Sequence, residues 1–520
     1  FLLIFHNIII PKPFPIEILV MLLRSSTLLG VALLLQQGQC RTYPLTVPDL
    51  PKDGNLVSPD LQSFSIEFCN FPDFAGNKSH PNEFTKALLR NLEQITGAPP
   101  VIRVGGSTQY ENSILIFLQA AANAACRSIG SKLHLLELGN EFNFSPIKYR
   151  SFSNYSIEDY MHEWDTKSQS VVKSVHKACG DFPGFMAPSF YLLGDFDLGP
   201  YMDKLGDKFP STLRDFVNHT TAAERLFHSG YDGRNLTKEL SFHNYMMLNL
   251  PPIAPALSND LEKVLMNHTS IVAGLEPHIQ RAKNLAYLGH PYILGETNSV
   301  AMQGRNGFSN VFGDALWVVD FSLWAAEHVT LSPHIGPTTK EVLTTNNQNI
   351  ERLHFHQGLD YRYNAWQPIE TKVQAPTTRA PYYGHVMVAS ALGRSKETRV
   401  VNIPLNEDTE SAYAVYDSDK LAKLVVLNMQ SFNHTTGGTR SSSSYSFQVP
   451  GEFASAKVER LTALGSDVLD GITFGGVSYD YVLNKGQPVV VGPQNETLAL
   501  QDGVLNVTLP DSSAVLLTLS

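Results

Sequence analysis

Short apolar runs with the character of strands alternate with helical stretches between residues 60 and 360. This alternation is typical of a parallel α/β sheet whose strands are each followed by a covering helix. We predict helices at residues 157–178, 261–288 and 312–328. Seven strands are clear and an eighth, given last here, is weaker: 64–69, 100–104, 133–138, 185–188, 240–245, 292–295, 352–356 and 113–118. Eight strand–helix units close a (β/α)₈ TIM barrel, which we favour over an open doubly wound sheet because polar motifs follow several strands.

The pattern changes near residue 395. Short alternating segments are now separated by clusters of Gly, Ser, Asn and Pro, and no helical period is visible. This sequence pattern is typical of an antiparallel β-sandwich, and the residues at 435–444 predict a flexible loop. At 520 residues the chain is long enough for two packed units, so we predict a catalytic barrel at 41–390 and a C-terminal sandwich at 391–520.

The N-terminal segment has the features of an export signal. Residues 1–20 precede the first methionine, Met21, and we interpret them as a non-native upstream segment. One basic residue and the apolar run 28–35 follow, which predicts a signal peptide at 21–40 and a mature chain that starts near Arg41. The apolar run is too short to cross a bilayer, so we expect a secreted, extracellular protein without a membrane anchor after signal removal.

Asn-x-Ser/Thr sequons are numerous enough to favour an extracellular glycoprotein with N-linked glycans. Eight are favourable, at Asn77, Asn154, Asn218, Asn235, Asn267, Asn433, Asn495 and Asn506. Beyond the leader, the chain has Cys69, Cys126 and Cys179, which permit at most one intrachain disulfide and leave the pair open.

Charge and composition restrict the class of partner. The chain has 39 basic and 49 acidic residues, a net charge of −10 and no concentrated run of Lys and Arg. A nucleic-acid groove or a site for a sulfated polyanion needs a basic face. We therefore expect no nucleic-acid partner.

Two glutamates follow two strands of the predicted barrel. The strand at 133–138 runs into Gly139-Asn140-Glu141, and the strand at 292–295 into Glu296. Carboxyl ends of barrel strands meet at one mouth, so we expect these carboxyl groups to face each other. Hydrolysis of a glycosidic bond with retention needs such a pair, one as acid/base, Glu141, and the other as nucleophile, Glu296. The competing interpretation is that both are ordinary loop glutamates.

Other polar residues at strand ends are candidates for substrate binding. Asn140 can donate its amide to the sugar 2-hydroxyl, a contact that strengthens in the transition state. Arg103 can keep the nucleophile ionised, or can belong to a structural ion pair. Tyr245 can donate to Glu296, or can be a rim aromatic. Glu67 can accept sugar hydroxyls, or can be a buried structural carboxylate.

His354 and His356 share one face of the last predicted strand by its period of two. A metal site needs further ligands, and none is suggested by the sequence. We predict neither a metal nor another cofactor.

Taken together, these motifs resemble glycoside hydrolase family 79, the retaining β-glucuronidase and heparanase family, and especially its fungal members. The resemblance covers most of the mature chain and is carried by FSIEFCNFPDFAG (64–76), IRVGG (102–106), ELGNE (137–141), FHNY (242–245), LGETNS (294–299), FHQG (355–358) and APYYG (380–384). It implies a (β/α)₈ barrel plus a sandwich that a strand near 43–48 often joins. It also implies Glu141 as acid/base and Glu296 as nucleophile, with Asn140 and Tyr245 in the sugar site.

Three features depart from the family pattern. The segment 106–137 is shorter than usual, which predicts a truncated third-strand region, and 330–350 resembles an insertion. Glucuronate-specific relatives place a Tyr shortly after the nucleophile to bind the substrate carboxylate, and residues 299–304 contain none. We expect backbone amides near Gly304, Arg305 or a tyrosine from elsewhere to serve instead.

The leading hypothesis is an exo-β-glucuronidase that releases glucuronic acid or its 4-O-methyl form from extracellular polysaccharide or proteoglycan. The first alternative is a retaining β-glycosidase of another specificity. The second is a non-catalytic carbohydrate-binding protein, against which the intact Glu141 and Glu296 argue.

Overall fold

The computed structural model describes residues 41–50, 55–108, 115–144, 156–192, 219–249, 260–328, 350–451 and 453–520. The upstream segment, the leader, two of the sequons (Asn154 and Asn218) and nearly all of the predicted insertion at 330–350 lie outside these ranges.

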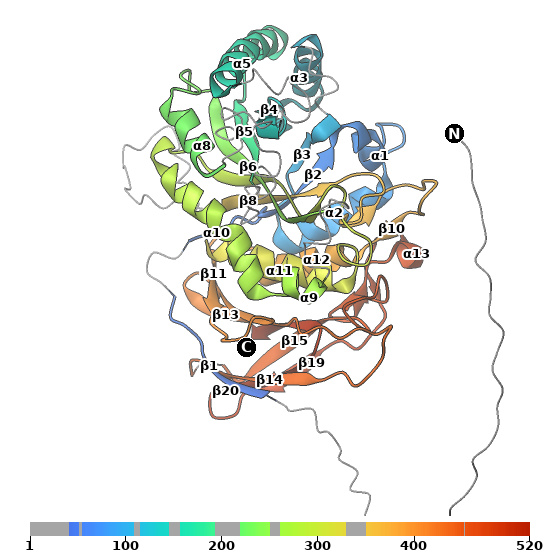
Figure 1. Ribbon diagram of the computed structural model, residues 1–520. Coiled ribbons are helices and arrows are strands. Elements are labelled where there is room, and N and C mark those ends of the chain that lie inside the picture. Colours follow the sequence, from blue (N-terminus) through green and yellow to red (C-terminus); the bar gives the residue numbers. More distant parts are fainter. Residues whose placement is uncertain are drawn as a thin grey trace, which may run out of the picture. The chain divides into compact units, whose positions relative to one another are not determined.

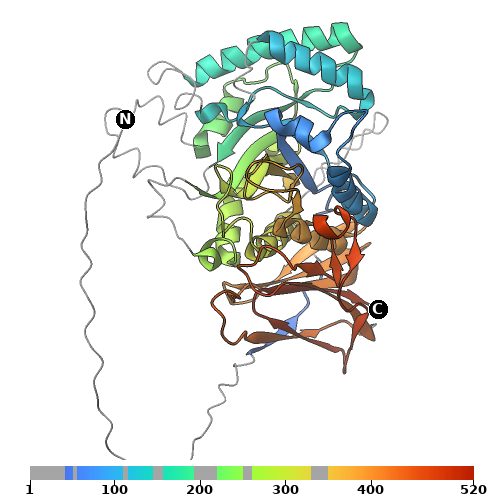
Figure 2. The same cartoon turned by 90° about the vertical axis from the view of Figure 1, so that its right-hand side faces the viewer.

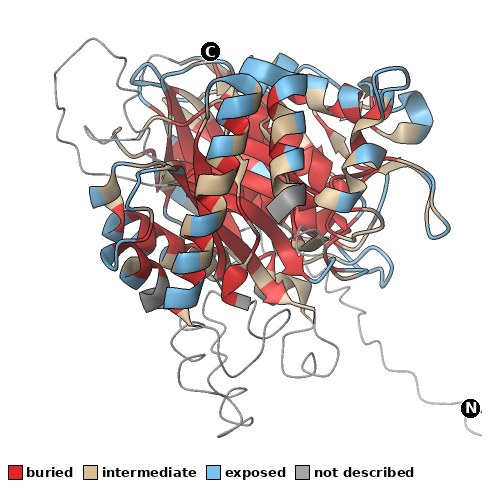
Figure 3. Cartoon of the chain, turned by 90° about the horizontal axis from the view of Figure 1, so that it is seen from above, coloured by how far each residue is buried: buried red, intermediate tan, exposed pale blue. Residues whose placement is uncertain are grey.

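A parallel sheet of seven strands forms the barrel, in the order β3-β2-β8-β7-β6-β5-β4 (Figures 1 and 3). Its strands are β2 (Gln62–Glu67), β3 (Ile102–Gly105), β4 (Leu136–Glu137), β5 (Phe185–Leu192), β6 (Thr237–Leu248), β7 (Tyr292–Ala301) and β8 (Ile350–Gln357). Every residue of β2, β7 and β8 is buried, as expected of parallel strands covered on both faces. In Figure 3 the strands are mostly red, while the helices around them expose pale blue outer faces. The sheet is thus a nearly closed barrel.

The predicted eighth strand at 113–118 is wrong. Helix α3 (Leu115–Ile129) occupies this region, because the apolar run continues into the alanine-rich segment QAAANAAC, which favours a helix. The part of the sheet that the structure describes therefore ends at β3 on one side and β4 on the other. The gap between these two edge strands falls in the segment 106–137, for which the sequence predicts a truncated third-strand region and of which residues 109–114 lie outside the described ranges.

The helices begin where the sequence supplies caps. Helix α5 (Ile157–Cys179) starts with a capping box between Ser156 and Asp159, close to the predicted bounds. The single helix predicted at 261–288 is instead three: α9 (Leu261–Val264), α10 (His268–Asn284) and the 3₁₀ turn η7 (Ala286–Leu288). Asn267 causes the first break, because its side chain accepts from the Ser270 N–H and starts α10 anew. The other long helices are α2 (Glu83–Thr96), α8 (His219–His228), α11 (Phe312–Glu327) and α12 (Ala380–Leu392).

Helices α11 and α12 are buried on almost every side. Helix α11 packs against β8 on one side and against β11 (Thr398–Ile403) of the C-terminal region on the other. A helix between two sheets has no solvent face, which explains why these two helices are apolar all round.

The C-terminal region is a sandwich of two β-sheets. The larger sheet runs β11-β12-β13-β21-β15-β16-β17-β18, and β19 also pairs with β15. The smaller sheet is β1-β14-β20, in which β1 (Arg41–Thr46) pairs in parallel with β14 (Ser442–Gln448), so the start of the described chain joins this sandwich (Figure 2). Apolar side chains from both sheets, including Phe447 and Leu517, form a common core. The remaining bounds are β12 (Glu410–Asp417), β13 (Lys420–Asn428), β15 (Ser455–Thr462), β16 (Thr473–Phe474), β17 (Val477–Ser478), β18 (Val489–Val490), β19 (Glu496–Ala499), β20 (Val504–Pro510) and β21 (Ser513–Leu519).

One disulfide joins Cys126 on α3 to Cys179 at the end of α5. It leaves Cys69 as an exposed free thiol, and resolves the pairing that the sequence left open. No helix within the described ranges is both long and apolar enough to cross a membrane.

Candidate active site

The position of Glu296 depends on an irregularity in the pairing of β7 with β6. The register of β7 against β6 skips Gly295, so that Glu296 pairs with His243. A Cβ on Gly295 would lie 2.1 Å from the Ser241 hydroxyl oxygen, so only glycine fits this close approach of the two strands. The local sequence Gly295-Glu296 therefore sets the direction of the carboxylate.

The Glu296 carboxylate is buried and held at both oxygens. Arg103 Nη1 donates to Oε2 at 2.7 Å, and the Tyr245 hydroxyl donates to Oε1 at 2.7 Å. The His356 Nδ1 atom lies 3.7 Å from Oε2. Burial alone would raise the pKa of Glu296, but His356, His243 and Arg103 outweigh it and hold this pKa well below its ordinary value. Glu296 is therefore a fixed, ionised carboxylate.

Glu141 follows β4 through a tight turn. Gly139 has a φ of 92°, and a Cβ there would lie 1.7 Å from the Phe142 ring. Glu141 itself has a φ of 48°, an uncommon conformation for a residue with a side chain and one often found at functional sites. Its N–H donates to the Ser189 carbonyl at 2.8 Å, and its Oε1 lies 3.0 Å from the His243 Nδ1 atom. With a side chain 20% exposed, Glu141 is more accessible than Glu296 at 7%.

The two carboxyl groups lie close together. Glu141, His243 and Glu296 each present an atom within 4.8 Å of the others, which brings one oxygen of Glu141 within 4.8 Å of one oxygen of Glu296. Retaining glycosidases hold their carboxyl groups about 5–5.5 Å apart, whereas inverting enzymes need about 6.5–9.5 Å to admit a water. The upper limit of 4.8 Å is shorter than the separation that an inverting enzyme needs.

The same three residues are close enough to surround a cation, but their contacts do not suit one. Both oxygens of Glu296 already accept hydrogen bonds, and the Arg103 guanidinium lies 2.7 Å from one of them. A metal ion would have to displace these donors and tolerate the arginine charge beside it. The chemistry of this group suits a carboxylate pair.

Asn140 and Glu67 flank the pair. Asn140 Oδ1 accepts from Arg103 Nη2 at 2.6 Å, while its buried Nδ2 has no hydrogen-bond partner among the described residues. Glu67 accepts from the Thr108 N–H and hydroxyl and from the Tyr361 hydroxyl at 3.2 Å. Its burial would raise its pKa, but nearby His356 outweighs this and lowers the pKa of Glu67. Asn140 thus has a free donor, whereas Glu67 is already engaged by protein groups.

Gly304 and Arg305 lie on the loop after β7. Gly304 has a φ of 76° and packs against the Tyr363 backbone, where a Cβ would lie 2.7 Å from the Tyr363 nitrogen. The Arg305 guanidinium carbon lies 5.4 Å from the centroid of the Phe308 ring. The hydrogen bonds to Glu296 come from Arg103 and Tyr245 rather than from this loop.

Several groups in the site were not predicted from the sequence. His243 binds Glu141, and His356, considered only as a metal ligand, lies between Glu67 and Glu296. Glu137 binds Arg103, which also donates to Ser65. The period of two was the available signal, because His243 precedes Tyr245 by two residues and Ser65 precedes Glu67 by two.

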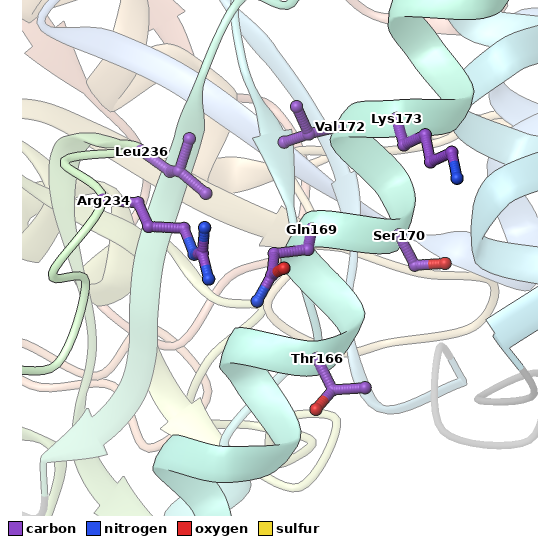
Figure 4. A pocket seen from close by; sticks show the side chains of 7 residues that line it. All are labelled: Thr166, Gln169, Ser170, Val172, Lys173, Arg234 and Leu236. Atoms are coloured by element: carbon purple, nitrogen blue, oxygen red, sulfur yellow. The ribbon is translucent and has the colours of Figure 1, made fainter.

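A separate groove of about 490 Å³ lies beside α5 and the start of β6 (Figure 4). Its lining contains none of the residues described above; it consists of Thr166, Gln169, Ser170, Val172, Lys173, Arg234 and Leu236. Arg234 and Gln169 both bind Asp165, so much of its polar surface is already paired.

Comparison with known sequences gives consistent matches over both regions. Residues 412–516 match the family profile described as the glycosyl hydrolase family 79 C-terminal beta domain. A beta-glucuronidase of Aspergillus niger is 34% identical over 551 residues, which cover 90% of this chain and 93% of that protein. A beta-glucuronidase of Neurospora crassa is 30% identical over 538 residues, which cover 84% of this chain and 87% of that protein.

Comparison with solved structures shows the same fold. The structure of a 4-O-α-L-rhamnosyl-β-D-glucuronidase from Fusarium oxysporum 12S covers 92% of this chain and 100% of its own, with a TM-score of 0.68 and 19% identity. At this identity the likeness concerns the fold alone.

Proposed function

The chain belongs to glycoside hydrolase family 79 and is a glycosidase, and we propose that it is a secreted, retaining exo-β-glucuronidase. Its substrates would be glucuronic acid or 4-O-methylglucuronic acid residues on extracellular polysaccharide or proteoglycan. The observation that carries the proposed mechanism is the approach of Glu141 and Glu296 to within 4.8 Å, because this separation suits direct attack by a carboxylate.

Glu296 is the nucleophile in this proposal. Its carboxylate attacks the anomeric carbon, the bond to the leaving oxygen breaks, and a covalent glycosyl-enzyme ester forms. Its low pKa keeps it ionised at the pH of an extracellular medium. Arg103 and Tyr245 hold both oxygens, so little reorientation is needed before attack.

Glu141 is the acid/base. It gives its proton to the leaving oxygen in the first step and removes a proton from the attacking water in the second. Its greater exposure supports this role, because the second step needs water to reach it. Two displacements at the same carbon return the β configuration.

Asn140 contacts the sugar 2-hydroxyl in this proposal. Its unpartnered Nδ2 is a buried donor, and a buried donor without an acceptor carries a free-energy cost that a bound ligand can remove. A hydrogen bond at this position strengthens as positive charge develops on the ring.

The substrate carboxylate requires donors or positive charge, because a desolvated anion without them costs several kcal/mol. The loop that follows β7 contains Gly304 and Arg305, and the amides near Gly304 and the Arg305 guanidinium are the candidate donors; the Arg305 N–H itself donates to the Ser309 hydroxyl at 2.6 Å. A tyrosine from elsewhere is also at hand, since the ring of Tyr363 lies 6.0 Å from that of Tyr245. The relatives named beta-glucuronidase support a uronate over a neutral sugar.

Secretion and glycosylation belong to the same proposal. The sequon asparagines Asn77, Asn235, Asn433, Asn495 and Asn506 are exposed, and Asn267 is half-buried at the start of α10. Exposed acceptors are what the transfer of N-glycans requires.

The deciding experiment measures kcat/KM for aryl β-D-glucuronide, glucoside, galactoside and xyloside, with Glu296→Gln as the inactive control. We expect the glucuronide to give the highest value. A higher value for a neutral sugar would favour the alternative of another β-glycosidase and leave the mechanism intact. Binding of glycosides without any turnover would favour a non-catalytic carbohydrate-binding protein.

A further inference from the structure

Arg103 contacts four polar side chains at once. An arginine has five N–H groups in a fixed planar fork. Nη1 donates to Ser65 and to Glu296, both at 2.7 Å, and Nη2 donates to Asn140 at 2.6 Å. The remaining donors reach Glu137, where Nε lies 2.9 Å and Nη2 2.8 Å from Oε2. The guanidinium therefore cannot rotate without breaking several hydrogen bonds at once.

Glu137 is the group that anchors this fork from outside the sugar site. Its side chain is 5% exposed, and its Oε1 accepts from the Ser189 hydroxyl at 2.6 Å. Glu137 lies on β4 and Arg103 on β3, the two strands at which the described sheet ends. Their ion pair thus joins two strands that share no hydrogen-bonded ladder there, and it replaces the pairing that a strand between them would give.

The anchored fork determines which end of the Asn140 amide faces the substrate. The amide oxygen and nitrogen of an asparagine are nearly equal in size, so hydrogen bonding decides the orientation. Arg103 Nη2 demands an acceptor, so the amide oxygen turns toward it and Nδ2 remains as the buried, unpartnered donor. Glu137 contributes to this orientation, because its ion pair with Arg103 fixes the plane of the guanidinium and with it the direction of the Nη2 N–H groups.

We propose that Glu137 is a positioning residue that acts through Arg103 and orients the Asn140 amide toward the sugar 2-hydroxyl. This inference deepens the proposed retaining mechanism and rests on it, but not on the choice of glucuronide. Glu137 touches no reacting atom in this scheme. Its effect appears only where the substrate has a 2-hydroxyl to receive the Asn140 donor.

The test compares an aryl glycoside with its 2-deoxy analogue in wild type and in Glu137→Gln. A glutamine has one acceptor oxygen and an NH₂ group, so it cannot offer an oxygen to both Nε and Ser189 as the two carboxylate oxygens do, and it removes the charge that pairs with Nη2. We expect kcat/KM for the parent glycoside to fall at least about tenfold, and the ratio of parent to 2-deoxy rates to fall by about the same factor. Asn140→Ala should lower the same ratio, and the double variant should lower it no further.

Glu239→Gln is the matched control. Glu239 lies on β6 with a side chain 6% exposed, and it accepts from the buried Arg352 at 3.0 Å. Its loss removes an equally buried carboxylate from an arginine in the same sheet, and we expect the rate ratio to stay at its wild-type value. If Glu137→Gln fails to fold, Ser189→Ala removes one of the hydrogen bonds to Glu137 and should lower the ratio by a smaller factor.

Two results would overturn the inference. One is an equal loss on both substrates in Glu137→Gln, since a merely structural residue affects them alike. The other is a fall in the ratio for Glu239→Gln as large as that for Glu137→Gln. The comparison uses whichever aryl glycoside the wild type cleaves best, so a preference for a neutral sugar would reject the glucuronidase proposal without affecting this one.

Discussion

Tyr245 on β6 donates its hydroxyl to Oε1 of Glu296 on the neighbouring strand β7 at 2.7 Å. Burial raises the pKa of Tyr245 well above its ordinary value, so the phenol keeps its proton. A neutral phenol can orient an ionised carboxylate without competing for its charge.

Tyr245→Phe removes that donor and leaves Arg103 in place. A hydrogen bond to a charged group contributes about 1.5–3 kcal/mol, so we expect kcat on an aryl glycoside to fall roughly ten- to hundredfold. Tyr287→Phe, at an exposed position on η7, should leave kcat unchanged. Wild-type kcat in Tyr245→Phe would show that the hydroxyl does not orient the nucleophile.

Glu141→Ala separates the acid/base from the nucleophile. Substrates with poor leaving groups need protonation and should lose far more rate than activated aryl glycosides. Azide should then enter the space left by the carboxylate, restore part of the rate and yield a glycosyl azide of β configuration. Equal losses on both substrate types without rescue by azide would contradict the assignment of Glu141.

Secretion can be tested in a eukaryotic host. We expect the secreted protein to start near residue 41 and to lose mass on endoglycosidase treatment. Asn77→Gln and Asn506→Gln, at two exposed sequons, should each reduce the mass by one glycan. A secreted protein that still contains residues 1–40, or whose mass the endoglycosidase does not change, would contradict this prediction.

The barrel strands were predictable because each is a short apolar run flanked by helix signals. The predicted starts of β5 and β7 match the structure, at Phe185 and Tyr292, whereas the ends fall short. For β7 the shortfall has a physical cause, because the strand continues into the polar residues Glu296–Ser299, and polarity there resembles a loop. The segment 113–118 failed for the opposite reason, since an apolar run of this length occurs in helices and in strands.

The site was predicted in its chemistry but not in its network. A glutamate after a strand is visible in a sequence, so Glu141 and Glu296 could be proposed. The buried partner of Arg103, Glu137, could not be predicted, because the two residues meet only through the fold. The same is true of Glu137 and Ser189, since Glu137 precedes β5 by almost fifty residues. Likewise His356 shares a face with His354, and only the structure shows that it turns toward Glu67.

Arg305→Ala tests the binding of the substrate carboxylate. If the guanidinium pairs with a uronate, its loss should raise KM for the glucuronide by about tenfold or more and change glucoside turnover little. Lys173→Ala, which removes a cation from the groove of Figure 4, should change neither value. Equal effects of Arg305→Ala on both sugars would show that it stabilises the loop and does not recognise the uronate.

An ion pair between two helices of the barrel also accepts a hydrogen bond from the sandwich. The His268 Nδ1 atom on α10 lies 2.9 Å from Asp320 Oδ2 on α11, and the Tyr413 hydroxyl on β12 donates to Asp320 Oδ1 at 2.5 Å. Burial opposes the charge on His268, but Asp320 outweighs it and raises the pKa of His268. Burial likewise opposes the charge on Asp320, and His268 outweighs it and lowers the pKa of Asp320.

The pair should make stability depend on pH. Folding raises the pKa of His268. Its contribution to stability is therefore complete at pH values below its pKa in the unfolded chain, about 6.5, and is lost as the pH rises through its pKa in the folded protein. Folding lowers the pKa of Asp320. Its contribution to stability is complete at pH values above its pKa in the unfolded chain, about 3.9, and is lost as the pH falls through its pKa in the folded protein. His268→Gln should therefore lower Tm most between about pH 4 and 6.5 and progressively less toward pH 8.5. The control is His162→Gln, on the exposed side of α5, which should leave Tm unchanged over the whole range. Thermal unfolding of the three proteins across this range measures the difference, and a His268→Gln effect that stayed constant or grew above pH 7 would mean that the charged pair does not hold the interface.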